Sequence, residues 1–118
     1  MFKHNETGIK GEAIAVKFLQ KKGFIIIAQN WRFEKKEIDI IAKFNNILVF
    51  VEVKTRSNLR FGPPEESVGV KKQAFLKFAA EAFLAANKYD DCPIRFDVIG
   101  IMVERGTLKD IQHFEDAF

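Results

Sequence analysis

The length, composition and charge of the chain predict one globular domain over residues 1–118. Hydrophobic residues make up 47% of the 118 and charged residues 30%, which excludes a disordered chain, and the single cysteine excludes a disulfide scaffold. The net charge of +3 is uneven, since residues 1–89 carry 16 Lys or Arg against 9 Asp or Glu, whereas residues 90–118 carry 3 against 7. A basic body favours an anionic partner such as nucleic acid, although lysines also solubilise ordinary surfaces.

The sequence contains no signal for a membrane or for export. Its longest apolar runs fall well short of the about 18 residues that a membrane helix needs. The N-terminus, Met-Phe-Lys-His-Asn-Glu, lacks the apolar core of a secretory signal peptide. We therefore expect a cytoplasmic protein with no membrane partner.

The predicted secondary structure mixes helices and strands. Apolar residues spaced by three and four predict a helix over residues 8–22, with Thr7 as its N-cap and Gly23 at its end. A second helix is expected over 65–87, after a loop at 57–64 that holds two prolines and a glycine. Runs of β-branched and apolar residues predict strands over 24–31, 37–44, 47–56, 94–103 and 108–114. The order α-β-β-β-α-β-β predicts an α/β (α+β) fold with a central mixed sheet flanked by helices.

The second and third strands predict a hairpin that groups several charged residues. If Asn45 and Asn46 form a two-residue turn, cross-strand partners have numbers that sum to 91, so Asp39 lies opposite Glu52. Glu37 then lies opposite Lys54, and all four side chains project from one face of the hairpin. The other face is apolar and is expected to be core; it carries Ile38, Ile40, Ala42, Val49, Val51 and Val53.

Two carboxylates directly opposite each other are destabilising unless one is protonated or a cation lies between them. Aspartate and glutamate oxygens are ligands that Mg²⁺ prefers, and Lys54, one pleat beyond Glu52, is placed to stabilise a phosphate. Asp39, Glu52 and Lys54 therefore predict a metal-dependent phosphodiesterase. The alternative is a solvated strand face with a Glu37–Lys54 ion pair, and a longer loop would shift the register that pairs Asp39 with Glu52.

A known signature runs through these same residues. Asp39 followed on the next strand by Glu52-Val53-Lys54 resembles the Asp…Glu-x-Lys signature of the PD-(D/E)XK nuclease superfamily. Glu-x-Lys alone is a weak motif, and its surroundings make the resemblance more specific. Over nearly the whole chain the sequence is similar to the YraN-like family of small bacterial proteins, in the segments Gly8-Ile-Lys-Gly11-Glu12-x-x-Ala15, Phe18-Leu19, Gly23-Phe24, Asn30-Trp31-Arg32, Glu37-Ile-Asp39-Ile-Ile-Ala42, Phe50-Val-Glu52-Val-Lys54-x-Arg56, Phe61-Gly62, Lys72-Gln73 and Arg95-Phe-Asp97-Val.

The YraN-like family is regarded as endonuclease-like and as related to archaeal-type Holliday junction resolvases. The resemblance implies a restriction-endonuclease-like core, α-β-β-β-α-β, and metal-dependent cleavage of DNA. The relation to resolvases favours branched or structured DNA, in repair or recombination, without excluding RNA. A resolvase cuts two symmetric strands, so a homodimer is compatible with this reading.

The resemblance also implies roles for single residues. Asp39 and Glu52 would bind Mg²⁺ or Mn²⁺, with the Val53 carbonyl and Glu12 completing the metal site, and Lys54 would be the catalytic lysine. Further residues of the second helix, Lys72 and Gln73, match a polar position that faces the site in the superfamily. Glu12 has the alternative of being an ordinary solvated glutamate on the helix surface.

One residue departs from the family pattern. The family usually has Gly-Glu-Ile-Asp, and here Lys36 replaces that glycine. A glycine there would let a phosphate or a bulge approach closely, so activity or substrate choice is expected to depend on this position. The positive charge of Lys36 would instead compensate for the missing glycine by contacting a phosphate directly.

Other residues have a functional and an ordinary interpretation. Basic residues near or after the third strand are candidates to follow a phosphate backbone, with surface charge as the alternative; they are Arg56, Arg60, Lys71, Lys72 and Lys77. Trp31 is expected in the core rather than stacked on a base. Phe75, Phe78 and Phe83 are expected to form one buried helix stripe, and Asp97 is expected to pair with Arg95.

Two further functions remain open from the sequence. A nucleic-acid-binding accessory protein of the same fold, without useful catalysis, would bind DNA with a steep salt dependence and no need for divalent ions. A protein–protein adaptor would have no affinity for DNA. Metal binding at the hairpin separates the nuclease from both.

Overall fold

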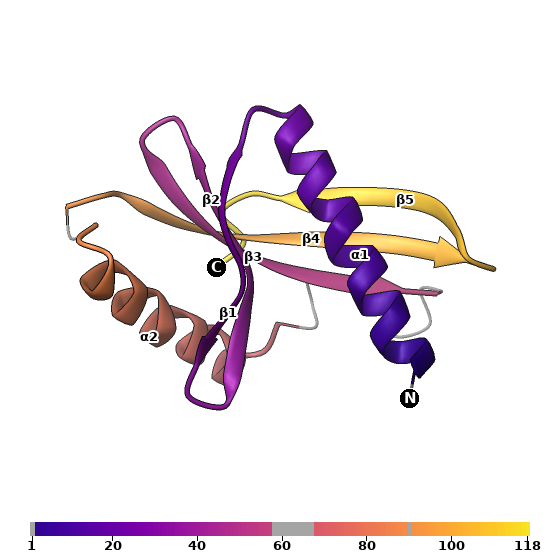
Figure 1. The fold of residues 1–118 in the computed structure, drawn as a ribbon, viewed down its shortest axis with the longest axis horizontal. Coiled ribbons are helices and arrows are strands. Elements are labelled where there is room, and N and C mark those ends of the chain that lie inside the picture. The colour runs from indigo at the N-terminus through magenta and orange to yellow at the C-terminus, as the bar shows by residue number, and fades with distance from the viewer. Residues whose placement is uncertain (1, 58–67, 90) are drawn as a thin grey trace.

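The computed structural model describes residues 2–57, 68–89 and 91–118, and the side chains of these from residue 11 onward. Its elements, in chain order, are α1 (Phe2–Lys21), β1 (Ile25–Phe33), β2 (Lys36–Phe44), β3 (Ile47–Arg56), α2 (Val70–Ala86), β4 (Ile94–Glu104) and β5 (Thr107–Phe114). The five strands form one sheet in the order β1-β2-β3-β4-β5. Only the β3–β4 pair within this sheet is parallel, and α2 lies between these two strands in the chain (Figure 1).

This architecture confirms the predicted fold class: an α+β fold in which two helices flank a five-stranded mixed sheet, consistent with a restriction-endonuclease-like core. All five predicted strands are present. In the described part of the chain, no helix combines the length and the apolar character needed to cross a membrane.

The helix boundaries differ from the prediction by several residues at both N-terminal ends and by one residue at both C-terminal ends. α1 begins at Phe2, so Thr7 lies within the helix and the prediction that it is the N-cap is wrong. α2 begins at Val70 because Gly69 is extended, with φ −75° and ψ 174°, and it ends at Ala86, one residue early. Most of the predicted loop, from residue 58 onward, lies outside the described residues.

The end of α1 follows the prediction. Gly23 has φ +98°, a conformation that glycine adopts without strain. The Gly23 N–H donates to the Gln20 carbonyl and the Phe24 N–H to the Leu19 carbonyl, each over 3.0 Å. Phe24 and Leu19 are buried together, so the helix ends in a Schellman motif with its hydrophobic contact.

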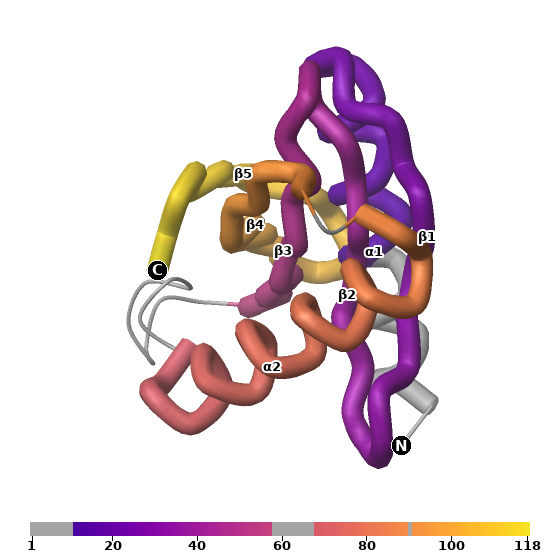
Figure 2. Tube along the Cα trace, turned by 90° about the vertical axis from the view of Figure 1, so that its left-hand side faces the viewer, coloured from indigo at the N-terminus to yellow at the C-terminus, as the bar shows by residue number. Residues whose placement is uncertain are grey.

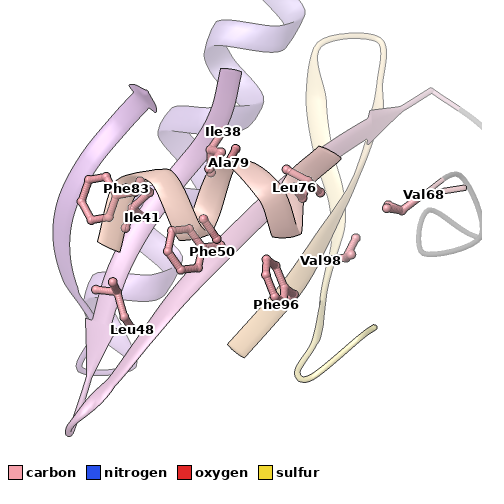
Figure 3. Packing of buried hydrophobic residues seen from close by; sticks show 11 residues of the cluster. Ile38, Ile41, Leu48, Phe50, Val68, Leu76, Ala79, Phe83, Phe96 and Val98 are labelled. Carbon is pink, nitrogen blue, oxygen red and sulfur yellow. The ribbon is translucent and has the colours of Figure 1, made fainter. Parts of the chain in front are cut away.

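Each helix buries one face of the sheet, as Figures 1 and 2 show. The α1 side buries Ala15 and Leu19 against apolar side chains of the strands, which include Ile40, Ala42, Val49, Val51, Ile99 and Ile101. The α2 side buries Leu76, Ala79 and Phe83 against Ile38, Ile41, Leu48, Phe50, Phe96 and Val98 (Figure 3). The predicted apolar hairpin face is confirmed as core at Ile40, Ala42, Val49 and Val51, whereas Ile38 packs on the α2 side instead. The face predicted to be polar is also core at Ile41, Leu48 and Phe50, so that part of the prediction is wrong.

A close approach of α1 to β3 depends on Gly11. A Cβ placed on Gly11 would overlap the hydroxyl oxygen of Thr55. The absence of a side chain thus lets the helix backbone rest on the strand two residues after the Glu52-Val53 pair. Glu12, the next residue of the helix, is held at this crossing.

Gly11→Ala is expected to lower the free energy of unfolding by about 1–3 kcal/mol, because overpacking outweighs the gain in helix propensity. Urea unfolding measures the change. Adding Thr55→Ala should restore most of the stability, since the overlapping atom is removed. Gly69→Ala is the control, because no atom lies within 4 Å of a Cβ there. Wild-type stability of Gly11→Ala would contradict the proposed contact.

A buried charged network joins β4 to the C-terminal segment. Asp97 is fully buried and accepts hydrogen bonds from Arg95 Nε and Nη2 at 2.8 and 2.9 Å, which confirms the predicted pair. His113 Nε2 lies 2.7 Å from Asp97 Oδ2, and the Asp116 N–H donates to Oδ1 over 3.0 Å. Burial alone would raise the pKa of Asp97, but the hydrogen bonds from His113 and Arg95 lower it below its ordinary value. The sequence assigned no role to His113.

Asp97→Asn should lower the free energy of unfolding by about 3 kcal/mol, because it leaves Arg95 without its buried counter-charge. In the wild type this contribution is present above the unfolded-state pKa and is lost as pH falls through the lowered folded-state pKa. Chemical unfolding at pH 7 and pH 3 measures both effects. The exposed Asp110→Asn is the control, and equal losses in the two variants would contradict a structural role for the network.

Candidate active site

The β2–β3 hairpin has the predicted register over five residue pairs. Asn45 has φ +55°, which suits the tight turn, and the partners run from Phe44–Ile47 to Ile40–Val51. The ladder ends there. Asp39 does not lie in a backbone pair with Glu52, and its Oδ2 instead accepts a hydrogen bond from the Val53 N–H over 2.8 Å. The prediction of directly opposed carboxylates is therefore wrong in detail, because the Asp39 side chain takes the place of a backbone partner.

Glu52 is a buried carboxylate, with 5% of its surface exposed. Its Oε2 lies 3.3 Å from Lys54 Nζ on the same strand and 3.5 Å from Lys72 Nζ on α2. Its Oε1 is also buried and has no hydrogen-bond partner. A buried carboxylate oxygen without a donor or cation is costly, so this atom is the unsatisfied point of the site.

The predicted ion pair between Glu37 and Lys54 is not formed. Glu37 Oε2 instead lies 3.4 Å from Arg32 Nη1 on the neighbouring strand, at the surface. The two strands no longer pair at this level, so Lys54 contacts the nearer Glu52. Lys54 therefore lies beside the buried carboxylate of Glu52, the position expected for the catalytic lysine of the predicted nuclease.

Asp39 carries a raised pKa of about 7. Burial is the main cause, and the negative charges of Glu52 and Glu12 raise it further, against the lowering effects of the Val53 N–H and of Lys72. Such a value means that Asp39 and Glu52 share a site that a positive charge would stabilise.

Glu12 belongs to the same electrostatic environment. Its pKa is raised, mainly by burial and also by the charges of Glu37 and Glu52, whereas a hydrogen bond with the Asn30 side chain lowers it. Asn30 has φ +52°, and no role was predicted for it. An asparagine inside a β-rich run was the signal that could have marked it.

The donor set fits a hard divalent cation. Asp39, Glu52 and Glu12 offer carboxylate oxygens, the buried Glu52 Oε1 is unpaired, and Mg²⁺ needs only one or two carboxylates beside water molecules. Among the described residues, no three His, Cys, Asp or Glu side chains converge closely enough to enclose an ion by themselves. The Val53 carbonyl and Glu12 as ligands stay predictions.

The residues predicted to contact nucleic acid lie in different surroundings. Lys72 reaches the site through Glu52, whereas the Gln73 amide donates to the Val68 carbonyl over 3.0 Å at the start of α2. Arg56 donates to the adjacent Thr55 carbonyl over 3.4 Å and keeps a buried Nε without a partner. Two more, Lys36 and Lys71, are exposed, and Arg60 lies outside the described residues.

We expect Asp39 to titrate near pH 7 in EDTA, as its raised pKa states, and Glu52→Gln to lower that pKa because it removes a neighbouring negative charge. Carboxyl ¹³C NMR measures both values. Since the folded-state pKa exceeds the unfolded-state value, the stability that Asp39 contributes is present at low pH and is lost as pH rises from about 4 to about 7, by up to about 4 kcal/mol.

Glu37→Gln is the control for this titration, since Glu37 is not among the charges that shift Asp39. An Asp39 pKa near 4 in the wild type, or one unchanged by Glu52→Gln, would contradict the coupling of the two carboxylates.

Comparison with known proteins places the chain in a family. Residues 11–101 match the model of the family described as "Uncharacterised protein family UPF0102". A UPF0102 protein of Flavobacterium psychrophilum is 50% identical over 118 residues, which cover 100% of this chain and 98% of the relative. UPF0102 proteins of Natranaerobius thermophilus (50% identity; 98% of each chain) and Chlorobium phaeobacteroides (46%; 94% of this chain and 91% of the relative) are similar over almost the same span. The chain therefore belongs to the UPF0102 family, the YraN family whose motifs its sequence carries.

Proposed function

We propose that this protein is a metal-dependent endonuclease that hydrolyses phosphodiester bonds in DNA. The observation that carries the proposal is the Glu52 carboxylate, which is buried beside Asp39 and two lysines and keeps one oxygen without any partner. An ion pair that served stability alone would usually satisfy both oxygens of a buried carboxylate. A site that takes up a cation and a phosphate together accounts for both the unpaired oxygen and the lysines.

The metal ligands in this proposal are Asp39 and Glu52, with the Val53 carbonyl and Glu12 completing the set. A bound Mg²⁺ or Mn²⁺ supplies Lewis-acid stabilisation of a phosphate and lowers the pKa of a water molecule. The Val53 N–H holds Asp39 Oδ2 in position, and burial raises the pKa of this carboxyl to about 7, so a positive charge beside it would favour the ionised form.

In this proposal Lys54 and Lys72 contact the phosphates of the substrate. Lys54 Nζ lies 3.3 Å from Glu52, so a short side-chain movement exchanges this carboxylate for a phosphate oxygen. Its positive charge would then stabilise the negative charge that develops on phosphorus during hydrolysis. Lys72 keeps α2 close to Glu52 and offers a second positive charge to the strand.

Support for DNA as the substrate comes from charge and from the YraN-type motifs. Arg56 and Lys71 lie on the elements that carry the site, β3 and α2, and extend its positive charge. The resemblance to junction resolvases favours branched or structured DNA, and two sites in a homodimer would match two cut strands. RNA is a second substrate class that the same chemistry would accept.

Cleavage of labelled junction, flap, single-stranded and linear DNA tests the proposal. We expect cutting in Mg²⁺ or Mn²⁺ and none in EDTA. Asp39→Asn and Glu52→Gln should abolish it, and Lys54→Met should slow it by about 100-fold or more, because one positive charge is lost at the phosphate. Glu37→Gln is the matched control, since it removes a carboxylate of β2 that pairs at the surface. Full activity of Asp39→Asn and Glu52→Gln would refute the assignment.

A nucleic-acid-binding accessory protein is the second candidate. The two lysines already neutralise Glu52 without a metal ion, which is the observation in its favour. This function expects gel shifts that persist in EDTA and no cleavage on any substrate. Lys36→Gly, which restores the usual family residue, would then be the first variant to assay for recovered cleavage.

A further inference from the structure

The outer surface of α2 exposes an aromatic ring that the sequence placed in the core. Phe78 is 58% exposed, whereas Phe83 on the same helix is buried against the sheet. The prediction of one buried stripe through Phe75, Phe78 and Phe83 is wrong for Phe78, because 78 and 83 are five positions apart and lie on different sides of a helix. A large exposed apolar ring on a charged protein indicates a contact that is not part of the fold.

Phe78 does not stand alone. Its ring centroid lies 5.4 Å from that of Phe33, the last residue of β1, with the rings edge to face at 73°. Phe33 also contacts Phe75 at 6.3 Å. Behind them, Trp31 stacks parallel to Phe33 at 6.1 Å and meets the buried Phe83 at 5.2 Å. The three rings of Phe33, Phe75 and Phe78, called here the aromatic platform, are thus supported from the core.

Two lysines lie beside the platform. Lys36 Nζ lies 5.2 Å above the centroid of the Phe75 ring, so this departure from the family glycine adds a charge to the platform. Lys71 precedes Phe75 by four residues and lies beside it on the helix surface. The first turn of α2 carries no acidic residue. Glu34, next to Phe33 in the chain, and Glu81, one turn from Phe78 on α2, are also exposed, so the cation in direct contact with the platform is Lys36.

The platform lies on the same helix as a residue of the candidate active site. Lys72, which contacts Glu52, and Phe78 are six positions apart on α2, about 9 Å along its axis and about a third of a turn around it. A strand that follows the lysines from the site would bring a base to the platform.

We propose that the aromatic platform stacks against an unpaired nucleobase of the strand whose phosphate is held at Asp39 and Glu52. The inference rests on the proposed function only in requiring that a nucleic acid strand binds at that site. Every base has a flat π face, so stacking is tolerant of sequence, but an intact duplex keeps these faces covered. The platform therefore selects substrates with a single-stranded stretch.

Fluorescence anisotropy in EDTA tests this inference without any cleavage. The probes are a labelled 20-nucleotide single strand and the matching duplex. We expect Phe78→Ala to weaken binding of the single strand about tenfold and to leave duplex binding unchanged. Phe78→Tyr should retain the affinity, because it keeps the ring, and Phe78→Leu should lose as much as Phe78→Ala. Leu108→Ala is the control, since Leu108 is 43% exposed on the far edge strand β5.

A second probe reports stacking directly. A single strand that carries 2-aminopurine should lose fluorescence on binding to the wild type and to Phe78→Tyr, and keep it with Phe78→Leu. Retained affinity in Phe78→Leu would overturn the inference in favour of a simple apolar contact. A wild type that binds no single strand, or variants that change only self-association in sedimentation, would also overturn it.

The two proposals fail separately. Cleavage that depends on Glu52, with single-strand affinity indifferent to Phe78, would refute the platform and leave the nuclease in place. Ring-dependent stacking, without cleavage in any divalent ion, would support the platform and refute the nuclease.

Discussion

The burial of the Glu52 carboxylate is the constraint on which the rest of the site depends. A carboxylate that is 5% exposed must be compensated, and here the compensation comes from Lys54 on β3 and Lys72 on α2. The Lys72 contact joins the first turn of α2 to β3. The same two contacts leave Oε1 without a partner, so the compensation is incomplete. Stability alone gives no reason for this remaining atom, and the proposed binding of a cation would give one.

The end of the β2–β3 ladder opens the space around this carboxylate. As long as two strands pair, side chains at neighbouring positions pack against each other and against the helices. After Ile40 and Val51 the strands no longer pair, and the Asp39 carboxylate satisfies the Val53 N–H that the ladder has released. Asp39 is thereby fixed beside Glu52. Helix α1 packs closely on β3 near these carboxylates because Gly11 has no side chain that would overlap Thr55.

Asp97 shows by contrast what a structural buried carboxylate looks like. It is fully buried, and Arg95, His113 and the Asp116 N–H satisfy its two oxygens. Its pKa is lowered, whereas the pKa of Asp39 is raised to about 7. The pKa values of these two aspartates shift in opposite directions. Burial raises the pKa of Asp39 and the neighbouring carboxylates raise it further, whereas several hydrogen-bond donors to Asp97 outweigh the effect of its burial. This difference separates the candidate site from the rest of the core.

The sequence by itself determined the features that depend on neighbouring residues. The Asn45 turn and strand alternation were enough to predict the hairpin register as far as Ile40, and Gly23 was enough to predict the end of α1. The carboxylates and lysine of the site were predicted by the hairpin and, with Glu12 and Lys72, by the family motifs.

Only the tertiary structure decided the contacts between distant segments. The pairing of Lys72 with Glu52, of His113 with Asp97, and the exposure of Phe78 depend on how the helices and the last strand pack on the sheet. Local propensity and side-chain period carry no information about the partner of a residue 16 or 20 positions away. These contacts follow from the crossing of α2 over the sheet and from the point where β2 and β3 cease to pair, and both are set by packing of the whole core.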